Sequence, residues 1–258
     1  MSSLPMRIDA PGWYGKLGAL GDFASRRLPP GMVQACDHWL ARMLADSQAL
    51  LGERWLGAYL RAPLWRTAWA PGVLDEQWWF GALMPSCDAV GRYFPLLVLQ
   101  PRRAAPQDRI ALDHLELWWQ ALGRAMLHTL SEGVALAAFE DALAELPPWP
   151  TARPFAGDAP TLWPGRAGGM AAGSLPARLA LPDFLPWPVR VGLSQGLGGL
   201  AAQCLIDGLA DCSVWWPLLL PEAADAAPGV HRLVGLPDGA AFARLMGEGP
   251  SPGAGLRT

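Results

Sequence analysis

Three apolar segments joined by two short connections constrain the fold most strongly. They cover residues 64–70, 78–84 and 93–100, and each is rich in the aromatic and aliphatic residues typical of strands. The connections, at 71–77 and 85–92, contain Pro, Gly, Asp and Ser, which favour turns. Parallel neighbours would need a crossover of about a dozen residues or more, so these connections predict an antiparallel meander.

Helices are predicted on both sides of this meander. Apolar residues recur at helical spacing after Pro29 and Pro30, a second helical piece covers 53–60, and residues 108–146 contain two further helices. Two short strands are expected within residues 12–28. For residues 1–146 the order predicts an α+β domain, an antiparallel five-stranded sheet flanked by helices, in the order of longin or profilin-like domains.

Residues 147–258 are predicted to form a smaller, irregular α/β part. Residues 147–198 are rich in Pro and Gly but also contain Trp, Phe and Leu, so we interpret them as an irregular segment wrapped over the first domain. A helix over 197–206, strands over 213–220 and near 230–234, and a helix over 239–246 complete this part.

Composition and charge exclude several classes of protein. A hydrophobic share of 52% with 17% charged residues excludes a disordered chain, and a net charge of -3 offers no basic surface for nucleic acid. No apolar run approaches the roughly 20 residues of a membrane helix, and the first residues lack the apolar core of a signal peptide, so no membrane insertion and a cytoplasmic location are expected. Four cysteines without a C-x-x-C pair fit reduced thiols.

One motif is typical of catalysis. Ser194 lies in a G-x-S-x-G sequence at 192–196, and Asp207 or Asp211 and then His231 follow in the order of a hydrolase triad. The residues before it show neither an oxyanion-hole motif nor the alternating strands and helices of a hydrolase sheet. We therefore expect no enzyme, and a serine hydrolase is the alternative. No phosphate-binding loop or metal-ligand spacing is present, so we expect no cofactor and no metal.

Six charged residues lie within aromatic strands and turns: Lys16, Asp22, Arg26, Arg66, Asp88 and Arg92. A buried charge is costly unless it is paired, so these residues either pair with one another or face a surface that a partner uses. In the first interpretation Asp88 braces the 85–92 turn, with Arg92 or Arg66 as its structural ion pair. The second interpretation is a recognition surface. Both stay open at this point.

Several ordered blocks carry a resemblance to a known family. They are Gly12-Trp-Tyr-Gly-Lys16-Leu, Gly21-Asp22-Phe-x-Ser-Arg26-Arg-Leu-Pro29, Pro63-x-Trp65-Arg66, Met84-Pro-Ser86-x-Asp88-x-x-Gly91-Arg92-Tyr-Phe-Pro and Ser213-x-Trp215-Trp216. In these blocks the sequence resembles the N-terminal and C-terminal patterns of the TagF (ImpM) family of type VI secretion-associated proteins. Between Lys16 and Gly21 it has Leu-Gly-Ala-Leu where the family pattern has Leu-Pro-Ser-Arg.

The resemblance implies a cytoplasmic accessory protein that represses type VI secretion after translation by binding other proteins, in some systems the forkhead-associated scaffold protein. Some relatives carry a fused phosphatase domain, for which this chain has no acidic cluster. The direct partner and the oligomeric state are left open. The resemblance and the charge pattern together give the candidate partner-binding or family-motif residues: Lys16, Asp22, Arg26, Trp65, Arg66, Ser86, Asp88, Arg92, Trp215 and Trp216.

Replacing Ser194 by alanine separates the two functions. If the protein acts by binding, Ser194→Ala leaves its biological function intact, because no chemical step uses the hydroxyl. The measurement is an esterase assay on the purified wild type and variant, alongside a functional assay in the native bacterium. An esterase activity that disappears with this change would establish the hydrolase instead.

Overall fold

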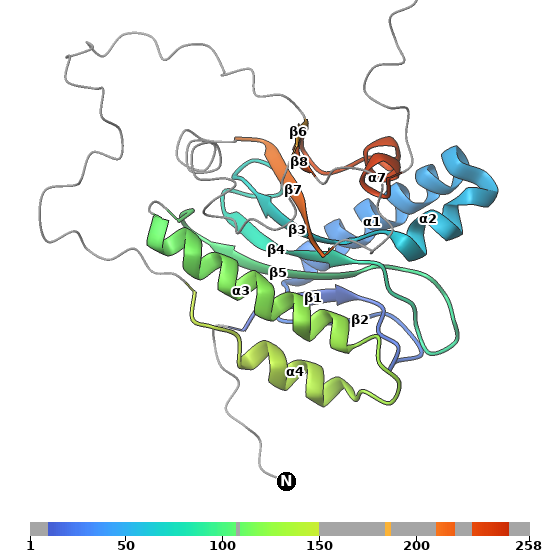
Figure 1. Cartoon of the computed structure of the whole chain (residues 1–258), viewed down its shortest axis with the longest axis horizontal. Coiled ribbons are helices and arrows are strands. Elements are labelled where there is room, and N and C mark those ends of the chain that lie inside the picture. The colour runs from blue at the N-terminus through green and yellow to red at the C-terminus, as the bar shows by residue number, and fades with distance from the viewer. Residues whose placement is uncertain (1–9, 107–108, 150–183, 187–209, 220–228, 248–258) are drawn as a thin grey trace, which may run out of the picture.

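A computed structural model of the chain describes residues 10–106, 109–149, 184–186, 210–219 and 229–247. These residues form an α+β fold in which helices cover both faces of one β-sheet (Figure 1). Every strand pair of the sheet is antiparallel. The predicted antiparallel sheet with packed helices is therefore confirmed.

The meander predicted from the short connections forms the centre of the sheet. Its strands are β3 (Leu64–Trp69), β4 (Trp78–Met84) and β5 (Leu96–Arg102), and each pairs with the next. The two short N-terminal strands are β1 (Gly12–Gly15), which pairs with β5, and β2 (Ala24–Arg26), which pairs with β1. The order of the whole sheet is β2-β1-β5-β4-β3-β7-β8-β6.

The expected number of five strands is wrong, because three strands from beyond residue 147 extend the same sheet to eight. These are β6 (Phe184–Pro186), β7 (Cys212–Leu219) and β8 (Gly229–Val234), and β7 pairs directly with β3. The physical reason lies in β3, which is buried along its whole length. A buried strand needs hydrogen-bonding partners on both sides, and β7 supplies the second. The division of the chain at residue 147 stays a prediction.

The helices follow the predicted order along the chain. They are α1 (Pro30–Leu51), the short 3-10 helix η1 (Gly52–Arg54), α2 (Trp55–Arg61), α3 (Arg109–His128), α4 (Leu136–Ala144) and α7 (Gly239–Leu245). The helix expected over 197–206 lies outside the described residues. None of the helices in the described part of the chain is long and apolar enough to cross a membrane.

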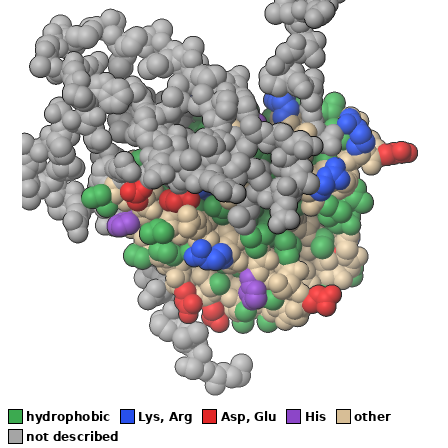
Figure 2. Space-filling view, in the orientation of Figure 1, with side chains coloured by type: hydrophobic (Ala, Val, Ile, Leu, Met, Phe, Trp, Pro, Cys, Tyr) green, Lys and Arg blue, Asp and Glu red, His purple; other side chains and the backbone are tan. Residues whose placement is uncertain are grey.

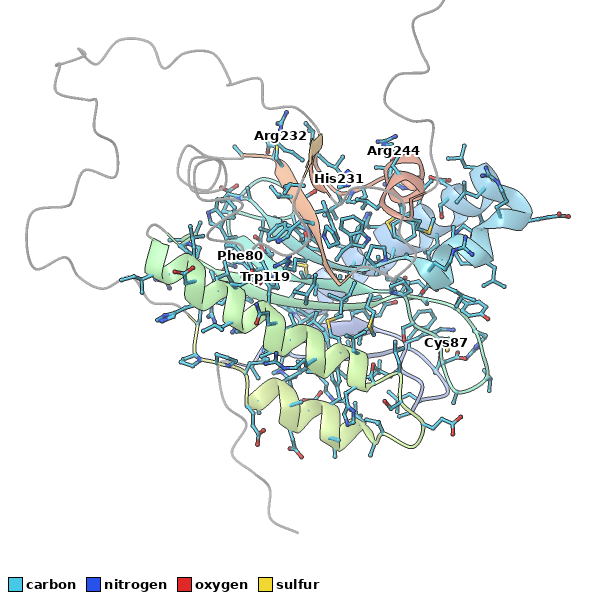
Figure 3. The ribbon with its side chains drawn as sticks, viewed as in Figure 1. Phe80, Cys87, Trp119, His231, Arg232 and Arg244 are labelled. Atoms are coloured by element: carbon cyan, nitrogen blue, oxygen red, sulfur yellow. The ribbon has the colours of Figure 1, made fainter. Side chains whose placement is uncertain are left out.

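Two aromatic cores lie on opposite faces of the sheet. On one face Trp119 of α3 packs edge-on against Trp216, with ring centroids 4.9 Å apart, and against Phe80 of β4 (Figure 3). On the other face Trp39 of α1 packs against Trp69 and Trp215. Successive residues of a strand point to opposite faces, so β7 contributes one tryptophan to each core. The C-terminal strands are thus part of both cores.

Gly81 in the middle of β4 tests this packing. A Cβ atom at this position would lie 1.9 Å from the backbone carbonyl oxygen of Val98 on β5. Because backbone atoms cannot move aside cheaply, Gly81→Ala should lower the free energy of unfolding by about 1–3 kcal/mol. Gly31→Ala in α1 is the matched control, since a Cβ there meets nothing within 4 Å. Urea unfolding measures both, and equal midpoints for the two variants would contradict the pairing of β4 with β5.

Candidate functional site

A buried ion pair joins two segments that are far apart in the sequence. The Nζ atom of Lys16, directly after β1, donates a hydrogen bond of 2.8 Å to Oδ2 of Asp88 in the turn between β4 and β5. Both side chains are almost completely buried. The pair fixes the 85–95 turn against the end of β1.

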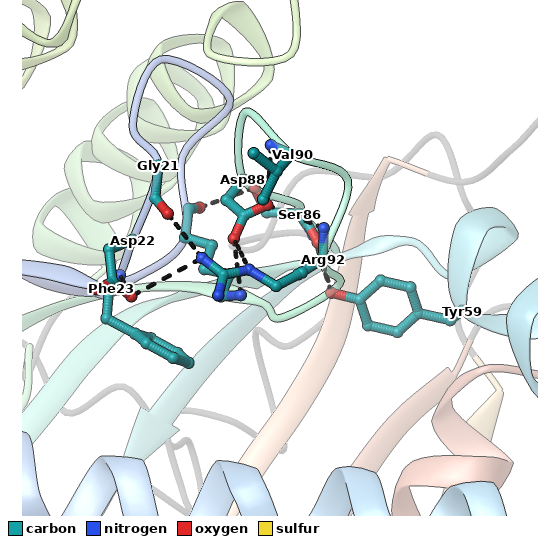
Figure 4. Close-up of polar contacts among 9 residues, drawn as sticks. Gly21, Asp22, Phe23, Tyr59, Ser86, Asp88, Val90 and Arg92 are labelled. Carbon is teal, nitrogen blue, oxygen red and sulfur yellow. Dashed lines mark hydrogen bonds and ion pairs between the residues drawn. The ribbon is translucent and has the colours of Figure 1, made fainter.

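The carboxylate of Asp88 organises the turn around itself. Oδ1 accepts the backbone N–H groups of Val90 and Arg92, at 3.1 and 2.9 Å, and Oδ2 also accepts Nε of Arg92 at 2.7 Å (Figure 4). Gly91 has a φ of 81°, which glycine adopts without strain. Burial by itself would raise the pKa of Asp88, but the hydrogen bonds from Lys16, Arg92 and Val90 hold this pKa well below its usual range.

Ser86 and Tyr59 attach the same turn to its neighbours. The Ser86 hydroxyl donates to the backbone carbonyl of Lys16 at 2.8 Å. The Tyr59 hydroxyl, from α2, donates to the carbonyl of Ser86 and accepts its N–H, each at 3.0 Å. The turn is therefore held by β1 on one side and by α2 on the other (Figure 4).

Arg92 is partly buried in this network and partly open to solvent. Its Nη2 atom donates to the carbonyl oxygen of Gly21 at 2.6 Å and lies 4.0 Å from Oδ1 of Asp22. Its side chain is 56% exposed. The expected ion pair between Asp88 and Arg92 is present. The pairing of Asp88 with Lys16 was not predicted, and its only signal in the sequence is that Lys16 is the only lysine.

The alternative pairing of Asp88 with Arg66 is wrong, because Arg66 lies in β3 and binds elsewhere. Its Nη1 atom donates to Glu116 of α3 at 2.8 Å and its Nη2 to the carbonyl of Pro217 at 2.7 Å. Burial lowers the pKa of Arg66 to about 10, and the charge of Glu116 opposes this shift. Arg66 thus fastens α3 to the sheet and lies apart from the turn.

The three tryptophans among the candidate residues are core residues. Trp65 packs edge-on against His231 of β8, with ring centroids 5.5 Å apart. Trp215 donates a hydrogen bond to Ser213, and Trp216 packs against Trp119 and lies 5.6 Å from the Arg66 guanidinium. All three are buried. These side chains therefore serve packing in the described fold.

Several side chains near the turn stay exposed, and five of them are here called the turn surface: Asp22, Phe23, Val90, Arg92 and Tyr93. Arg26, which pairs with Trp13 in the sheet, is exposed as well. Val90 is 69% exposed, Phe23 45% and Tyr93 39%. Tyr93 packs against Tyr59, and the Phe23 ring lies 4.7 Å from that of Phe94 and 4.7 Å below Nζ of Lys16. The apolar members were not predicted as site residues, because their exposure depends on the folded turn.

Charged side chains of both signs lie on the face in view (Figure 2). Figure 2 shows Lys and Arg side chains separated by hydrophobic and acidic ones on that face. Among the described residues no group of three or more His, Cys, Asp or Glu side chains could hold a metal ion.

Ser194 and Asp207, which carry the hydrolase alternative, lie outside the described residues. His231 is described, and its pKa is lowered to about 4 by burial and then by the charge of Arg244. Asp211 has a φ of 62° and bonds through its backbone to Pro71 and Gly235. Cys87, in the turn, lies well away from His231 (Figure 3). Because its pKa is about 4, the His231 side chain is uncharged at neutral pH.

Comparison with known proteins shows similarity to a family model and to solved structures. A family model described as the TagF N-terminal domain, type VI secretion system-associated, matches residues 12–146. The crystal structure of PA0076 from Pseudomonas aeruginosa PAO1 is similar to this chain with 33% sequence identity and a TM-score of 0.66, covering 96% of this chain and 100% of that one. A search of curated proteins gave no match.

The acid limb of the stability curve tests the Asp88 network. The pKa of Asp88 is lower in the folded than in the unfolded chain, so its stabilising effect is complete above about pH 4 and is lost as the pH falls toward the folded pKa. We expect the free energy of unfolding to fall less steeply between about pH 4 and pH 2 in Asp88→Asn than in the wild type. Asp22→Asn, which replaces a carboxylate whose side chain is 82% exposed, is the matched control. Equal slopes for wild type and Asp88→Asn would contradict the network.

Proposed function

The chain belongs to the TagF family of type VI secretion-associated proteins, and on that premise we propose that it is a non-catalytic accessory protein that binds another protein of the secretion system. The observation that carries the proposal is the turn surface. Motif residues 72 positions apart, Lys16 and Asp88, meet in a buried ion pair whose effect is to hold one surface turn in a fixed shape. A rigid turn at the surface is suited to binding a partner protein.

The physical advantage of such a turn is its low entropy loss on binding. Flexible loops lose conformational freedom when a partner orders them, and this loss subtracts from affinity. Here Asp88, Ser86 and Tyr59 already fix the backbone, while Val90, Tyr93 and Arg92 stay accessible. An apolar centre with a guanidinium beside it resembles the composition of interface hot spots, in which aromatic residues and arginine are enriched.

The direction of the regulation is proposed from the family. We propose that binding represses the secretion system after translation and takes place in the cytoplasm, with the forkhead-associated scaffold protein as the first partner to test. The non-catalytic role is supported by the family and by the structural roles of the motif residues. The esterase assay on the Ser194→Ala variant tests the non-catalytic role.

Arg92 is the residue that best separates recognition from stability. Lys16 remains beside Asp88 when Arg92 is removed, so Arg92→Ala does not leave a buried carboxylate without a counter-charge. We therefore expect Arg92→Ala to weaken binding of the scaffold protein by about tenfold or more, while Tm changes little. Titration calorimetry and thermal unfolding on the same preparation measure the two quantities.

Two further variants complete this experiment. Arg124→Ala removes an exposed arginine on α3 and should change neither binding nor Tm. Lys16→Met should lower Tm far more than Arg92→Ala does, because it removes the buried counter-charge. If Arg92→Ala lowers Tm as much as Lys16→Met, Arg92 is a structural residue and leaves the list of binding residues.

A further inference from the structure

The sheet has an accessible edge next to the turn surface. β2 is the last strand in the sheet order and pairs with β1 alone among the described strands. It ends after three residues, because Arg27 has a φ of 59° and turns the chain toward α1. An edge strand presents backbone groups that another strand can bind.

The backbone of Ser25 in β2 points outward from the sheet. Its carbonyl oxygen accepts a hydrogen bond of 2.8 Å from Nη1 of Arg26, in an exposed position, and so faces away from β1. In an antiparallel pair the N–H and C=O of one residue point to the same side, so the Ser25 N–H faces outward too. Arg26 thus covers this part of the edge with its own side chain, through a single exposed bond.

A groove of about 590 Å³ lies between this edge and α1. Phe23, Leu28 and Val33 give it apolar walls, and Ser25 lies at its side. Phe23 is held in place, stacked on Tyr14 and packed edge-on against Phe94. Phe23 is therefore a fixed wall of the groove, which has room for a side chain of a bound segment.

The polar end of the groove is acidic. The hydroxyl of Tyr14 donates a hydrogen bond to Oδ1 of Asp37 in α1. Burial, followed by the hydrogen bond to Asp37, raises the pKa of Tyr14 beyond its usual range, so Tyr14 stays neutral. Asp37 is then the only charged side chain among the residues that line the groove. Its charge favours a basic group in the occupant.

We propose that an extended segment of a partner protein adds to β2 as a further strand and places a lysine or arginine side chain in the groove against Asp37. Backbone hydrogen bonds to Ser25 supply affinity, and the side chain that alternates into the groove supplies specificity. The segment displaces Arg26 from the Ser25 carbonyl, which costs little because that bond is exposed. This site adds to the proposed binding function and is separate from Arg92.

Two blocked heptapeptides of alternating threonine and valine probe the site, one with a central lysine and one with a central glutamate. The full-length protein is labelled with ¹⁵N for amide shifts, and affinity is measured by fluorescence anisotropy. We expect the lysine peptide to shift the amide of Ser25 and to bind at least about tenfold more tightly than the glutamate peptide. Asp37→Asn should abolish that preference.

Ser25→Pro tests the strand addition itself. It removes an N–H that the pairing with β1 does not use, and proline is tolerated at such edge positions. We expect it to abolish binding of the lysine peptide, while Ser25→Ala retains it. Circular dichroism of each variant shows whether it is folded. An unchanged Ser25 amide in the presence of the peptide, or full binding by a folded Ser25→Pro, would overturn the proposal and leave Arg26 as a guard of the sheet edge.

The same variants distinguish this proposal from the proposed function. Suppose that Arg92→Ala loses binding of the scaffold protein, that Ser25→Pro keeps it, and that neither peptide binds. This result would overturn the groove proposal and leave the proposed protein-binding function standing. Peptide binding with the expected pattern and no binding of the scaffold protein would keep the groove and exclude that scaffold as the partner.

Discussion

The arrangement of the N-terminal half depends on the buried pair of Lys16 and Asp88. Removing two charges from water is costly, and the cost is offset only when each finds close partners. Asp88 finds Lys16, the guanidinium of Arg92 and two backbone N–H groups. Satisfying this one carboxylate therefore sets the path of the turn, its distance from β1 and the position of Arg92. The need to pair the buried Asp88 carboxylate thus determines the shape of the exposed turn.

Local pattern was enough to predict most of the helices and strands. The meander of β3, β4 and β5 was predictable because short connections leave no other way to pair neighbouring strands. Of the C-terminal strands, β7 and β8 were predicted as strands but not as part of the same sheet, and β6 lies in the stretch that was predicted to be irregular. The pairing of β7 with β3 joins residues that are far apart in the sequence, and a local sequence pattern does not predict a contact of that kind. A buried β3 without a second neighbour was the only available indication.

The candidate site residues show the same difference between what local sequence pattern predicts and what only the fold decides. The sequence showed that the charges in aromatic segments needed partners, but not which partners, because Lys16 and Arg66 both carry a positive charge that could pair with Asp88. The fold gives Arg66 to Glu116 of α3 and Lys16 to Asp88. Trp65, Trp215 and Trp216 attract notice as motif residues, yet their size makes them effective core residues on a sheet covered on both faces.

Which candidate residues are buried and which are exposed decides which of them a partner could contact. Most of the motif residues are occupied in holding the fold: Lys16, Ser86 and Asp88 are buried in the turn network, and the tryptophans lie in the cores. Of the candidate residues, Arg92, Asp22 and Arg26 stay exposed, and Val90, Tyr93 and Phe23 are exposed around the turn. Phe23 contacts both the turn network and the groove beside β2, since it packs under Lys16 and lines the groove. In the proposed binding function, the buried motif residues hold the turn in place and the exposed side chains on it are those available to a partner.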